Sequence, residues 1–343
     1  VIERHEVLRT FFVERDGIAY QEVRSSFDLP VTRLDLSSLS PEEQGREIEN
    51  LGLVDAERSF DLSCDLMLRV QLVKLSEDEY VVLFNMHHIA SDGWSMGVLV
   101  KEFAGLYSDF SLDQPSSLQP LSIQYGDYAV WQRDWLQGEV LEEQLGYWHN
   151  RLEGIPVVHS LPLDRPRPAH QTFRGSTFHQ TIGSEVTGQL QGLCREHDAT
   201  LFMVLQTAFS VLLHRYSGED DIVVGSPIAG RVHADIEPLI GFFVNTLVLR
   251  SQLEGSPAFS GLLDTHKQHI LNAYAHQHVP FEMLVEELQP ERSLSHSPLF
   301  QVMFVLQNNE QGVLSLPDIE LSTFEQSYQI AAFDLVLNAC DTP

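Results

Sequence analysis

The chain has 343 residues, of which 43% are hydrophobic. This is enough for a sizeable core and, on length alone, for about two domains. Its 21 lysines and arginines stand against 49 aspartates and glutamates, which leaves a formal net charge of −28. Because such an acidic surface repels phosphate backbones and anionic lipid heads, we expect no nucleic-acid partner and no membrane partner.

The cysteines and the apolar runs bear on the cellular compartment. Cys64, Cys194 and Cys340 are an odd number at wide spacing, which fits isolated thiols in a reducing compartment better than a disulfide framework. No apolar run approaches the length of a membrane span, and the start of the sequence has no signal-type pattern. We therefore expect a cytoplasmic protein.

Periodicity and turn residues predict the elements that precede residue 87. Asp16-Gly17 lies between two strand-like runs, which is a hairpin signal, and Ser40-Pro41 followed by Glu43 is typical of a helix start. The predicted elements are strands over 8–13 and 18–23, a helix from 41 to about 56, and strands over 66–72 and 80–84.

Two adjacent histidines follow the strand predicted over 80–84. The stretch reads His87-His88-Ile89-Ala90-Ser91-Asp92-Gly93 and leads into an amphipathic helix predicted over 95–110. Successive side chains of a strand point to opposite faces, so only one of the two imidazoles can face a given cleft. One histidine is therefore expected to be chemical, as a general base near neutral pH, and the other structural.

Asp92 and Gly93 have separate expected roles. An unpaired buried carboxylate is costly, so Asp92 is expected to brace the turn through an arginine rather than to touch a substrate. Gly93 lets a backbone or a ligand approach the start of a helix, where free N–H groups favour negative charge. Taken alone, a histidine pair is more often part of a satisfied core. Metal ligation fits less well, because adjacent strand residues diverge and no HExxH or paired CxxC pattern is present.

The rest of the chain predicts a second set of elements after a proline-rich linker. The linker, 154–175, contains four prolines and marks the expected domain boundary, with domains over 1–160 and 161–343. The predicted elements are a helix from 125 to 152 broken near Gly138, a strand over 173–182, helices over 185–197 and 200–216, strands over 222–224 and 242–249, helices over 257–274 and 280–288, and strands over 299–306 and 331–337.

Three kinds of polar or aromatic residues in this part have separate interpretations. Asn245 is an amide in an otherwise apolar strand and needs a hydrogen-bond partner. Trp131 belongs to an aromatic stripe of the 125–152 helix, which is more often core than ligand-binding. The histidines between 266 and 278 are spaced for no standard metal site, so we expect no metal.

The histidine motif resembles the His-His-x-x-x-Asp-Gly signature of the condensation domains of nonribosomal peptide synthetases and of the wider acyltransferase superfamily that includes chloramphenicol acetyltransferase. Five further stretches resemble the remaining motifs of the family and occur in its order. These are Arg4–Thr10, Tyr125–Trp131, Ile240–Thr246, His276–Glu282 and Arg292–Leu299.

The resemblance implies an α/β fold, an α+β sandwich. Two chloramphenicol-acetyltransferase-like lobes would form a V-shaped pseudo-dimer with a tunnel between them, the lobe over 1–160 carrying the histidine motif. The family's first motif is missing, and the domain would normally continue beyond residue 343. We therefore expect a fragment of a longer polypeptide, truncated in both lobes.

The resemblance also implies peptide-bond formation in nonribosomal peptide biosynthesis. A donor acyl or peptidyl thioester would be joined to the amino group of an aminoacyl thioester. Both substrates would arrive on the 4'-phosphopantetheine arms of upstream and downstream peptidyl carrier proteins, with an adenylation domain nearby, and the chain itself would bind no cofactor. General similarity near 298–306 and 333–337 favours an L-configured donor.

Residue roles follow from the same resemblance. His88 would hydrogen-bond or deprotonate the attacking amine, the Gly93 backbone would lie close to the thioester carbonyl, and His87 and Asp92 would hold the loop. An arginine of the first stretch would pair with Asp92, with Arg9 favoured over Arg4. Trp131 would support the site, and Ser95 and Asn245 are candidate substrate contacts, with a purely structural hydrogen bond equally plausible for Asn245.

Alternatives within and beyond the family are a coenzyme A-dependent acyltransferase and a non-catalytic condensation-like recruitment module. The complete histidine motif argues against the recruitment module, in which that motif is usually damaged. A heterocyclisation domain would carry aspartate in place of the motif histidines, and an epimerisation domain would carry a Glu-Gly-His-Gly segment that the sequence lacks.

Overall fold

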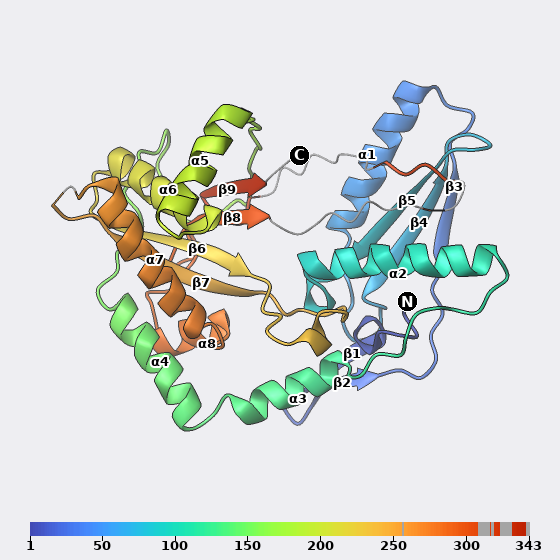
Figure 1. Cartoon of the computed structure of the whole chain (residues 1–343). Helices are drawn as coiled ribbons and strands as arrows, with labels where there is room; N and C mark the ends of the chain where they lie inside the picture. Colours follow the sequence, from blue (N-terminus) through green and yellow to red (C-terminus); the bar gives the residue numbers. More distant parts are fainter. Residues whose placement is uncertain (256, 308–315, 317–318, 323–330, 341–343) are drawn as a thin grey trace. The chain divides into compact units, whose positions relative to one another are not determined.

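The computed structural model describes residues 1–255, 257–307, 316, 319–322 and 331–340 (Figure 1). These residues form two compact units. The first contains 1–133, 231–243 and the described residues of 309–328, and the second contains the rest of the described chain. Helices and strands are mixed in both units, which confirms the predicted α/β class.

The compact units are discontinuous in sequence, whereas the lobes predicted over 1–160 and 161–343 are continuous. The segment 231–243 belongs to the first unit because Ile240 is buried in the same apolar cluster as Leu8, Met67 and Leu99. The lobe boundary at 160, the V-shaped arrangement and the tunnel stay predictions.

The first unit contains a hairpin, a three-stranded sheet and the helices beside it. Its elements are η1 (Glu6–Arg9), β1 (Thr10–Arg15), β2 (Ile18–Val23), β3 (Val31–Asp35), α1 (Pro41–Glu57), β4 (Leu68–Lys74), β5 (Tyr80–Met86), η2 (His88–Ala90), α2 (Gly93–Ser111), α3 (Tyr125–Trp135, which runs past the unit boundary) and η3 (Ala234–Ile236).

Local sequence signals account for the hairpin and for α1. Asp16 and Gly17 both have positive φ, as the two-residue turn between β1 and β2 requires, and the strands pair with Arg15 opposite Ile18. Ser40 and Glu43 form a complete capping box with Pro41 in the first turn of α1. Both elements therefore confirm the prediction.

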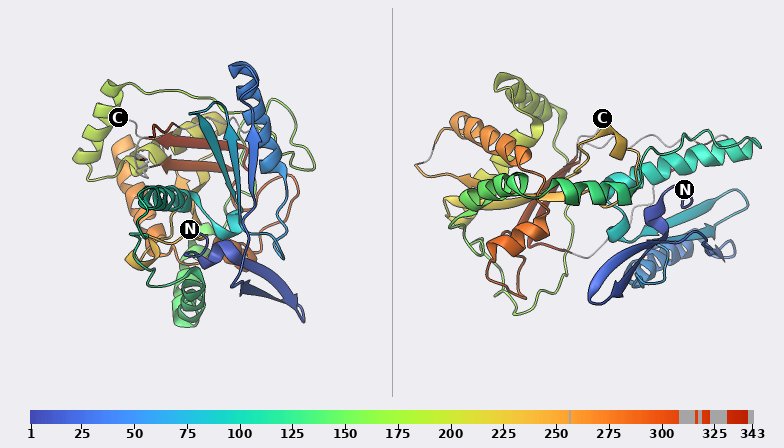
Figure 2. Two further views of the ribbon diagram at one scale, coloured as in Figure 1. Left: turned by 90° about the vertical axis from the view of Figure 1, so that its right-hand side faces the viewer. Right: turned by 90° about the horizontal axis from the view of Figure 1, so that it is seen from below.

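The sheet β3-β4-β5 has a helix on each face, and this arrangement places the histidine motif. β3 runs parallel to β4, and β5 runs antiparallel to it. Figure 2 shows α1 and α2 on opposite sides of this sheet. On one face of β5, Asn85 donates to the carbonyl of Asp55 in α1, and on the other Phe84 packs edge-on against Phe103 of α2. β5 therefore ends in a rigid frame directly before His87.

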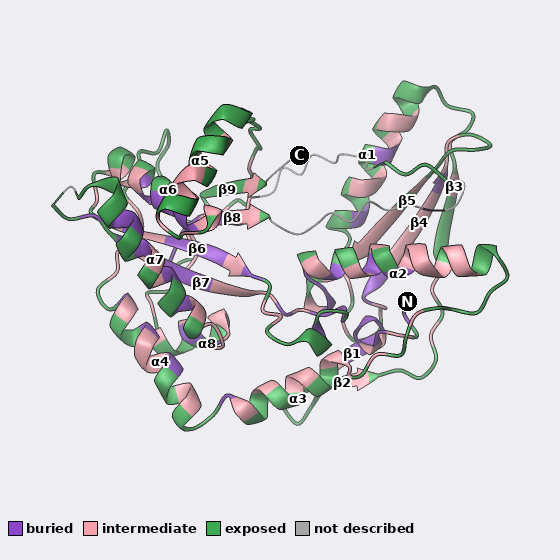
Figure 3. Ribbon diagram, in the orientation of Figure 1, coloured by how far each residue is buried: buried purple, intermediate pink, exposed green. Residues whose placement is uncertain are grey.

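The second unit is a four-stranded sheet covered by helices, in the order β7-β6-β8-β9. Its cores contain Trp148, Val204, Leu263 and Phe304, and Figure 3 shows β6 and β7 largely buried. The elements are α4 (Glu139–Leu152), α5 (Ser184–Glu196), α6 (Leu201–Ser217), β6 (Asp221–Ile228), β7 (Asn245–Gln252), α7 (Phe259–Ala275), α8 (Phe281–Leu288), β8 (Val302–Gln307) and β9 (Leu335–Cys340).

One strand prediction in this part is wrong, and a second strand is displaced along the chain. Residues 173–182 form no continuous strand. Only Arg174 is in a β-bridge, the Phe173 carbonyl accepts from the Ala331 N–H, and Phe173, Phe178 and Ile182 are exposed. The strand predicted over 242–249 begins only at Asn245, since the backbone of Phe242 and Phe243 bonds to side chains instead of a neighbouring strand. The break predicted at Gly138 is confirmed, because this residue has φ of 56° between α3 and α4.

None of the described helices combines the length and the apolar character needed to cross a membrane.

Candidate active site

The histidine motif forms the connection between β5 and α2, as predicted. His87 follows the last residue of β5, residues 88–90 make a single 3-10 turn, and α2 begins at Gly93. Asp92 is the N-cap of α2, and its carboxylate accepts from the backbone N–H of Ser95 at 2.8 Å. The short connection therefore fixes the two imidazoles in different environments.

His87 holds the turn. Its Nδ1 accepts from the backbone N–H of Ile89 at 3.0 Å, so a neutral ring carries its hydrogen on Nε2. The ring packs edge-on against Phe60 at a centroid distance of 5.4 Å, and burial lowers the pKa of His87. A neutral, bonded and partly buried imidazole of this kind is suited to a structural role.

His88 is exposed and presents a free ring nitrogen. Its Nδ1 lies 2.6 Å from the backbone oxygen of Ser91. Because a carbonyl only accepts, Nδ1 is the donor, and the lone pair of a neutral ring is then on Nε2. No described residue hydrogen-bonds to Nε2, while the Phe242 ring packs edge-on against the imidazole at 5.1 Å. This arrangement is the one required of a general base that receives a proton from outside the chain.

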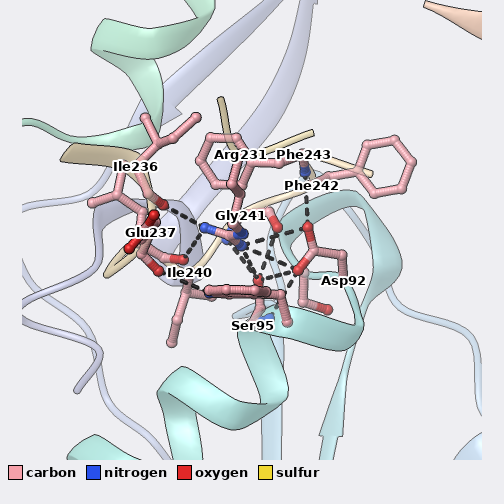
Figure 4. A network of polar contacts seen from close by, with 12 residues as sticks. Asp92, Ser95, Arg231, Ile236, Glu237, Ile240, Gly241, Phe242 and Phe243 are labelled. Atoms are coloured by element: carbon pink, nitrogen blue, oxygen red, sulfur yellow. Dashed lines mark hydrogen bonds and ion pairs between the residues drawn. The ribbon is translucent and has the colours of Figure 1, made fainter. Parts of the chain in front are cut away.

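Asp92 pairs with Arg231, a residue that sequence reasoning missed. The guanidinium lies 3.2 Å from the carboxylate, and the two side chains are 2% and 3% exposed (Figure 4). Arg231 also donates to the carbonyls of Ile236 and Leu239, and its guanidinium lies 4.2 Å from the centre of the Phe243 ring. Burial lowers the pKa of Arg231, and the carboxylate of Asp92 opposes this shift.

The prediction that Arg9, or failing it Arg4, pairs with Asp92 is wrong, although an arginine does brace the turn. The guanidinium of Arg9 donates to the carbonyl of Arg24 and lies 3.5 Å from Glu6. Arg4 bonds to Glu102 of α2 at 2.7 Å. Both guanidinium groups are therefore used elsewhere.

Glu102 also binds His5, which ties the first stretch of the chain to the site. The His5 side chain is buried, with Nε2 2.9 Å from Glu102 and Nδ1 accepting from the backbone N–H of Ile240. Of the groups predicted to support the site, Arg4 thus holds α2 through Glu102, and the role of Arg9 stays a prediction.

Ser95 is not available to a substrate, contrary to the prediction. It is fully buried, at 0% exposure. Its hydroxyl contacts Asp92, Gly241 and Arg231 at 2.7–3.1 Å. This hydroxyl therefore belongs to the support of the turn.

Gly93 is exposed at the start of α2. Apart from its chain neighbours and the backbone of its own helix, no described atom lies within 4 Å of the position that a Cβ would occupy, and its φ lies outside the left-handed region. Packing of the described residues therefore gives no reason for a glycine here, and the space above the first turn of the helix is open to a ligand.

Asn245 makes structural hydrogen bonds, which is one of the two roles expected for it. Its amide donates to the carbonyls of Gln277 and Val279 at 2.8 Å, and its oxygen accepts from the N–H of Phe281 and of Thr246. These bonds use the full donor capacity of the amide, so no hydrogen is left for a substrate.

Trp131 lies in α3, where its ring packs against those of Tyr128 and His233. Its side chain is 39% exposed. Support of the site by Trp131 therefore stays a prediction. Among the described residues, no three histidine, cysteine or acidic side chains are grouped in a way that could hold a metal ion.

Sequence reasoning also missed Phe242, Tyr125 and His5 as individual groups. All three lie within stretches that resemble family motifs, so the sequence carries a signal for their segments. Arg231 had none, because a single arginine in a loop far from residue 92 has no distinguishing pattern.

The fold of this chain is shared by solved domains from biosynthetic assembly enzymes. The X-domain from teicoplanin biosynthesis superimposes with a TM-score of 0.89 at 28% identity, over 99% of this chain and 76% of that one. The condensation domain of the monacolin K polyketide synthase MokA superimposes with a TM-score of 0.80 at 23% identity, over 99% and 78%, which shows the fold alone.

The chain belongs to the condensation domain family, whose model matches residues 1–342. It is 50% identical to one of the linear gramicidin synthase proteins of Brevibacillus parabrevis over 100% of its length, and 42% identical to tyrocidine synthase 3 of the same organism over 99%. It spans 7% and 5% of the length of these two relatives.

Proposed function

We propose that the chain forms a peptide bond between a donor acyl or peptidyl thioester and the amino group of an aminoacyl thioester, in nonribosomal peptide biosynthesis. Each substrate would be carried on the 4'-phosphopantetheine arm of a carrier protein. The observation that carries this proposal is the exposed His88 imidazole, whose Nδ1 is fixed by Ser91 and whose Nε2 is free.

The proposed reaction is an acyl transfer from sulfur to nitrogen. The acceptor amine attacks the thioester carbonyl carbon, a C–N bond forms, and Nε2 of His88 takes a proton from the nitrogen. The C–S bond then breaks, and the departing sulfur receives that proton. The products are an amide and a free thiol, so atoms and charges balance.

The remaining residues hold the geometry. Asp92 and Arg231 fix the turn, and His87 caps it. The open first turn of α2 at Gly93 is suited to the carbonyl oxygen on which negative charge develops. Because a thioester is already activated, positioning can supply much of the rate.

The length of the relatives supports a set of partners. Linear gramicidin synthase and tyrocidine synthase are far longer than this chain, which leaves room for carrier and adenylation domains in one polypeptide. We propose upstream and downstream peptidyl carrier proteins and an adjacent adenylation domain as partners.

Replacement of His88 tests the proposal. His88→Ala should lower the rate of dipeptide formation from carrier-bound aminoacyl thioesters by roughly 10²–10⁴-fold, the usual contribution of a general base. His179, an exposed histidine of the second unit, provides the control His179→Ala, which should keep the wild-type rate. Wild-type product formation by His88→Ala would remove the imidazole from the reaction.

A second candidate is a non-catalytic recruitment module. The X-domain that superimposes on this chain has been solved in complex with OxyB, another protein of teicoplanin biosynthesis. If the wild-type chain forms no product with any pair of carrier-bound substrates, that result would favour the recruitment module. Product formation from soluble acyl-coenzyme A without a carrier protein would instead favour a coenzyme A-dependent acyltransferase.

A further inference from the structure

The segment Ile240–Phe243 is held by side chains at successive backbone groups. These bonds are Ile240 N–H to His5 Nδ1 at 3.2 Å, Gly241 N–H to the Ser95 hydroxyl at 3.1 Å, the Tyr125 hydroxyl to Phe242 C=O at 2.9 Å, and Phe243 N–H to the Asp92 carboxylate at 3.0 Å. In a strand or a helix, such backbone groups would bond to other backbone groups. Here side chains take that place and fix an irregular segment in one conformation.

Tyr125 packs directly on this segment. A Cβ at Gly241 would lie 2.4 Å from the Tyr125 ring and 2.6 Å from the Phe243 ring. Only glycine therefore lets the tyrosine approach closely enough to reach the carbonyl of Phe242. Burial raises the pKa of Tyr125 to about 12, so its hydroxyl stays protonated and remains a donor at any physiological pH.

Phe242 connects this segment to His88. Its ring lies edge-on to the imidazole, with a centroid distance of 5.1 Å and an interplanar angle of 85°. The His88 ring is therefore restrained at two places, by the bond from Nδ1 to Ser91 and by the ring of Phe242. The first fixes the tautomer, and the second limits rotation of the exposed ring.

We propose that Tyr125 is a positioning residue for His88, acting through the carbonyl and the ring of Phe242. The hydroxyl holds the Phe242 peptide, the peptide sets the direction of the phenyl ring, and the ring keeps the imidazole in the orientation that presents Nε2. This proposal rests on the proposed function only for its catalytic consequence, because the coupling from Tyr125 to His88 is a property of the folded chain.

Tyr125→Phe is the test, since it removes one oxygen and leaves the aromatic packing in place. Tyr128→Phe is the matched control. Tyr128 lies on the same helix, packs on the same Phe243 ring at 4.8 Å, and its pKa is also raised by burial, but its hydroxyl makes no described bond to Ile240–Phe243.

Two measurements are made on the full chain. The nitrogen and proton NMR signals of the His88 imidazole, assigned with His88→Gln, should shift in Tyr125→Phe and stay unchanged in Tyr128→Phe. With carrier-bound aminoacyl thioesters, kcat should fall about fivefold in Tyr125→Phe with KM unchanged, the factor that corresponds to one net hydrogen bond.

Phe242→Leu shows whether the effect passes through the phenyl ring. In that background, Tyr125→Phe should cause no further change in either measurement, because residues that act in series are not additive. Independent effects of the two substitutions, or unchanged His88 signals in a folded Tyr125→Phe protein, would overturn the proposal.

The NMR readout separates this proposal from the proposed function. If His88→Ala keeps full turnover, the general-base proposal fails, while shifted His88 signals in Tyr125→Phe still support positioning. If His88→Ala is inactive and Tyr125→Phe changes neither signals nor kcat, only the positioning proposal fails.

Discussion

Arg231 and Asp92 form a buried ion pair although they stand 139 positions apart in the sequence. The local turn that carries His88 is thereby fixed by a segment that folds onto it from far along the chain. The same arginine binds the carbonyls of Ile236 and Leu239, so one guanidinium joins the turn to the whole 231–243 segment. The position of the histidines therefore depends on tertiary folding and not on the motif alone.

Arg231→Gln should destabilise the chain strongly. Removing one partner of a buried pair leaves the Asp92 carboxylate without its countercharge, so the free energy of unfolding should fall by about 3–5 kcal/mol. Urea unfolding followed by circular dichroism measures this. Arg9→Gln is the control, because Arg9 mainly donates to a carbonyl and its loss should cost about 1 kcal/mol. Equal losses in the two variants would contradict the assignment of Arg231 as the brace.

Local signals in the sequence were enough for most elements near the site. The capping box at Ser40, the Asp16-Gly17 turn and the periodicity of α2 each depend on residues close in sequence, and all three predictions are confirmed. The partner of Asp92 was not predictable in this way. The sequence indicates that a buried carboxylate needs a cation, but any arginine in the chain satisfies that requirement until the fold selects one.

Gly93→Ala should separate folding from catalysis. Alanine has room, since no described atom outside the neighbouring residues and the backbone of α2 lies within 4 Å of the position of its Cβ. Alanine is also a better helix former, so stability should stay equal or rise by up to about 1 kcal/mol. If the thioester carbonyl approaches this first turn, the added methyl group should lower the rate of dipeptide formation at least about tenfold, a loss of about 1.4 kcal/mol of transition-state stabilisation.

Gly97→Ala is the matched control for Gly93. It lies one turn further along α2, is also exposed, and has equally free space for a Cβ. We expect it to gain stability and to keep the wild-type rate. A comparable loss of rate in Gly97→Ala would mean that α2 responds to alanine in general, and a wild-type rate in Gly93→Ala would exclude a close approach of substrate there.

Asn245→Ala should affect stability and not chemistry. The amide satisfies the carbonyls of Gln277 and Val279 and the N–H of Phe281, so its removal should cost about 2–4 kcal/mol of unfolding free energy. The rate of dipeptide formation per folded molecule should stay within twofold of wild type. Asn150→Ala, which removes one exposed bond to Gly146, should cost less than about 1 kcal/mol. A rise in KM for Asn245→Ala, at a temperature where this variant is folded, would instead support a contact between Asn245 and the substrate.

The two interpretations of Asn245 show where sequence reasoning ends. An amide in an apolar strand needs a partner, and this much is visible from the residues. Whether the partner is a substrate or a carbonyl 32 positions away depends on the path of the chain between β7 and α8. The strand predicted over 173–182 has the same origin, because apolar residues form a strand only where they pair along their length, and here only Arg174 is in a β-bridge.

His266 should make the second unit sensitive to acid. Its ring is 2% exposed, neither nitrogen has a partner among the described residues, and burial lowers its pKa to about 4, with His269 and Arg151 adding to the shift. In the unfolded chain His266 becomes protonated near pH 6.5, whereas in the folded chain it stays neutral until the pH is near 4. Stability therefore falls as the pH drops from about 6.5 to about 4. Between pH 7 and pH 5 this single group should cost about 2 kcal/mol of unfolding free energy.

Urea unfolding at both pH values tests this prediction. His266→Leu should lack that loss of stability, whereas His170→Gln, at an exposed site, should keep it. If His266→Leu loses as much stability in acid as the wild type does, other groups cause the acid sensitivity.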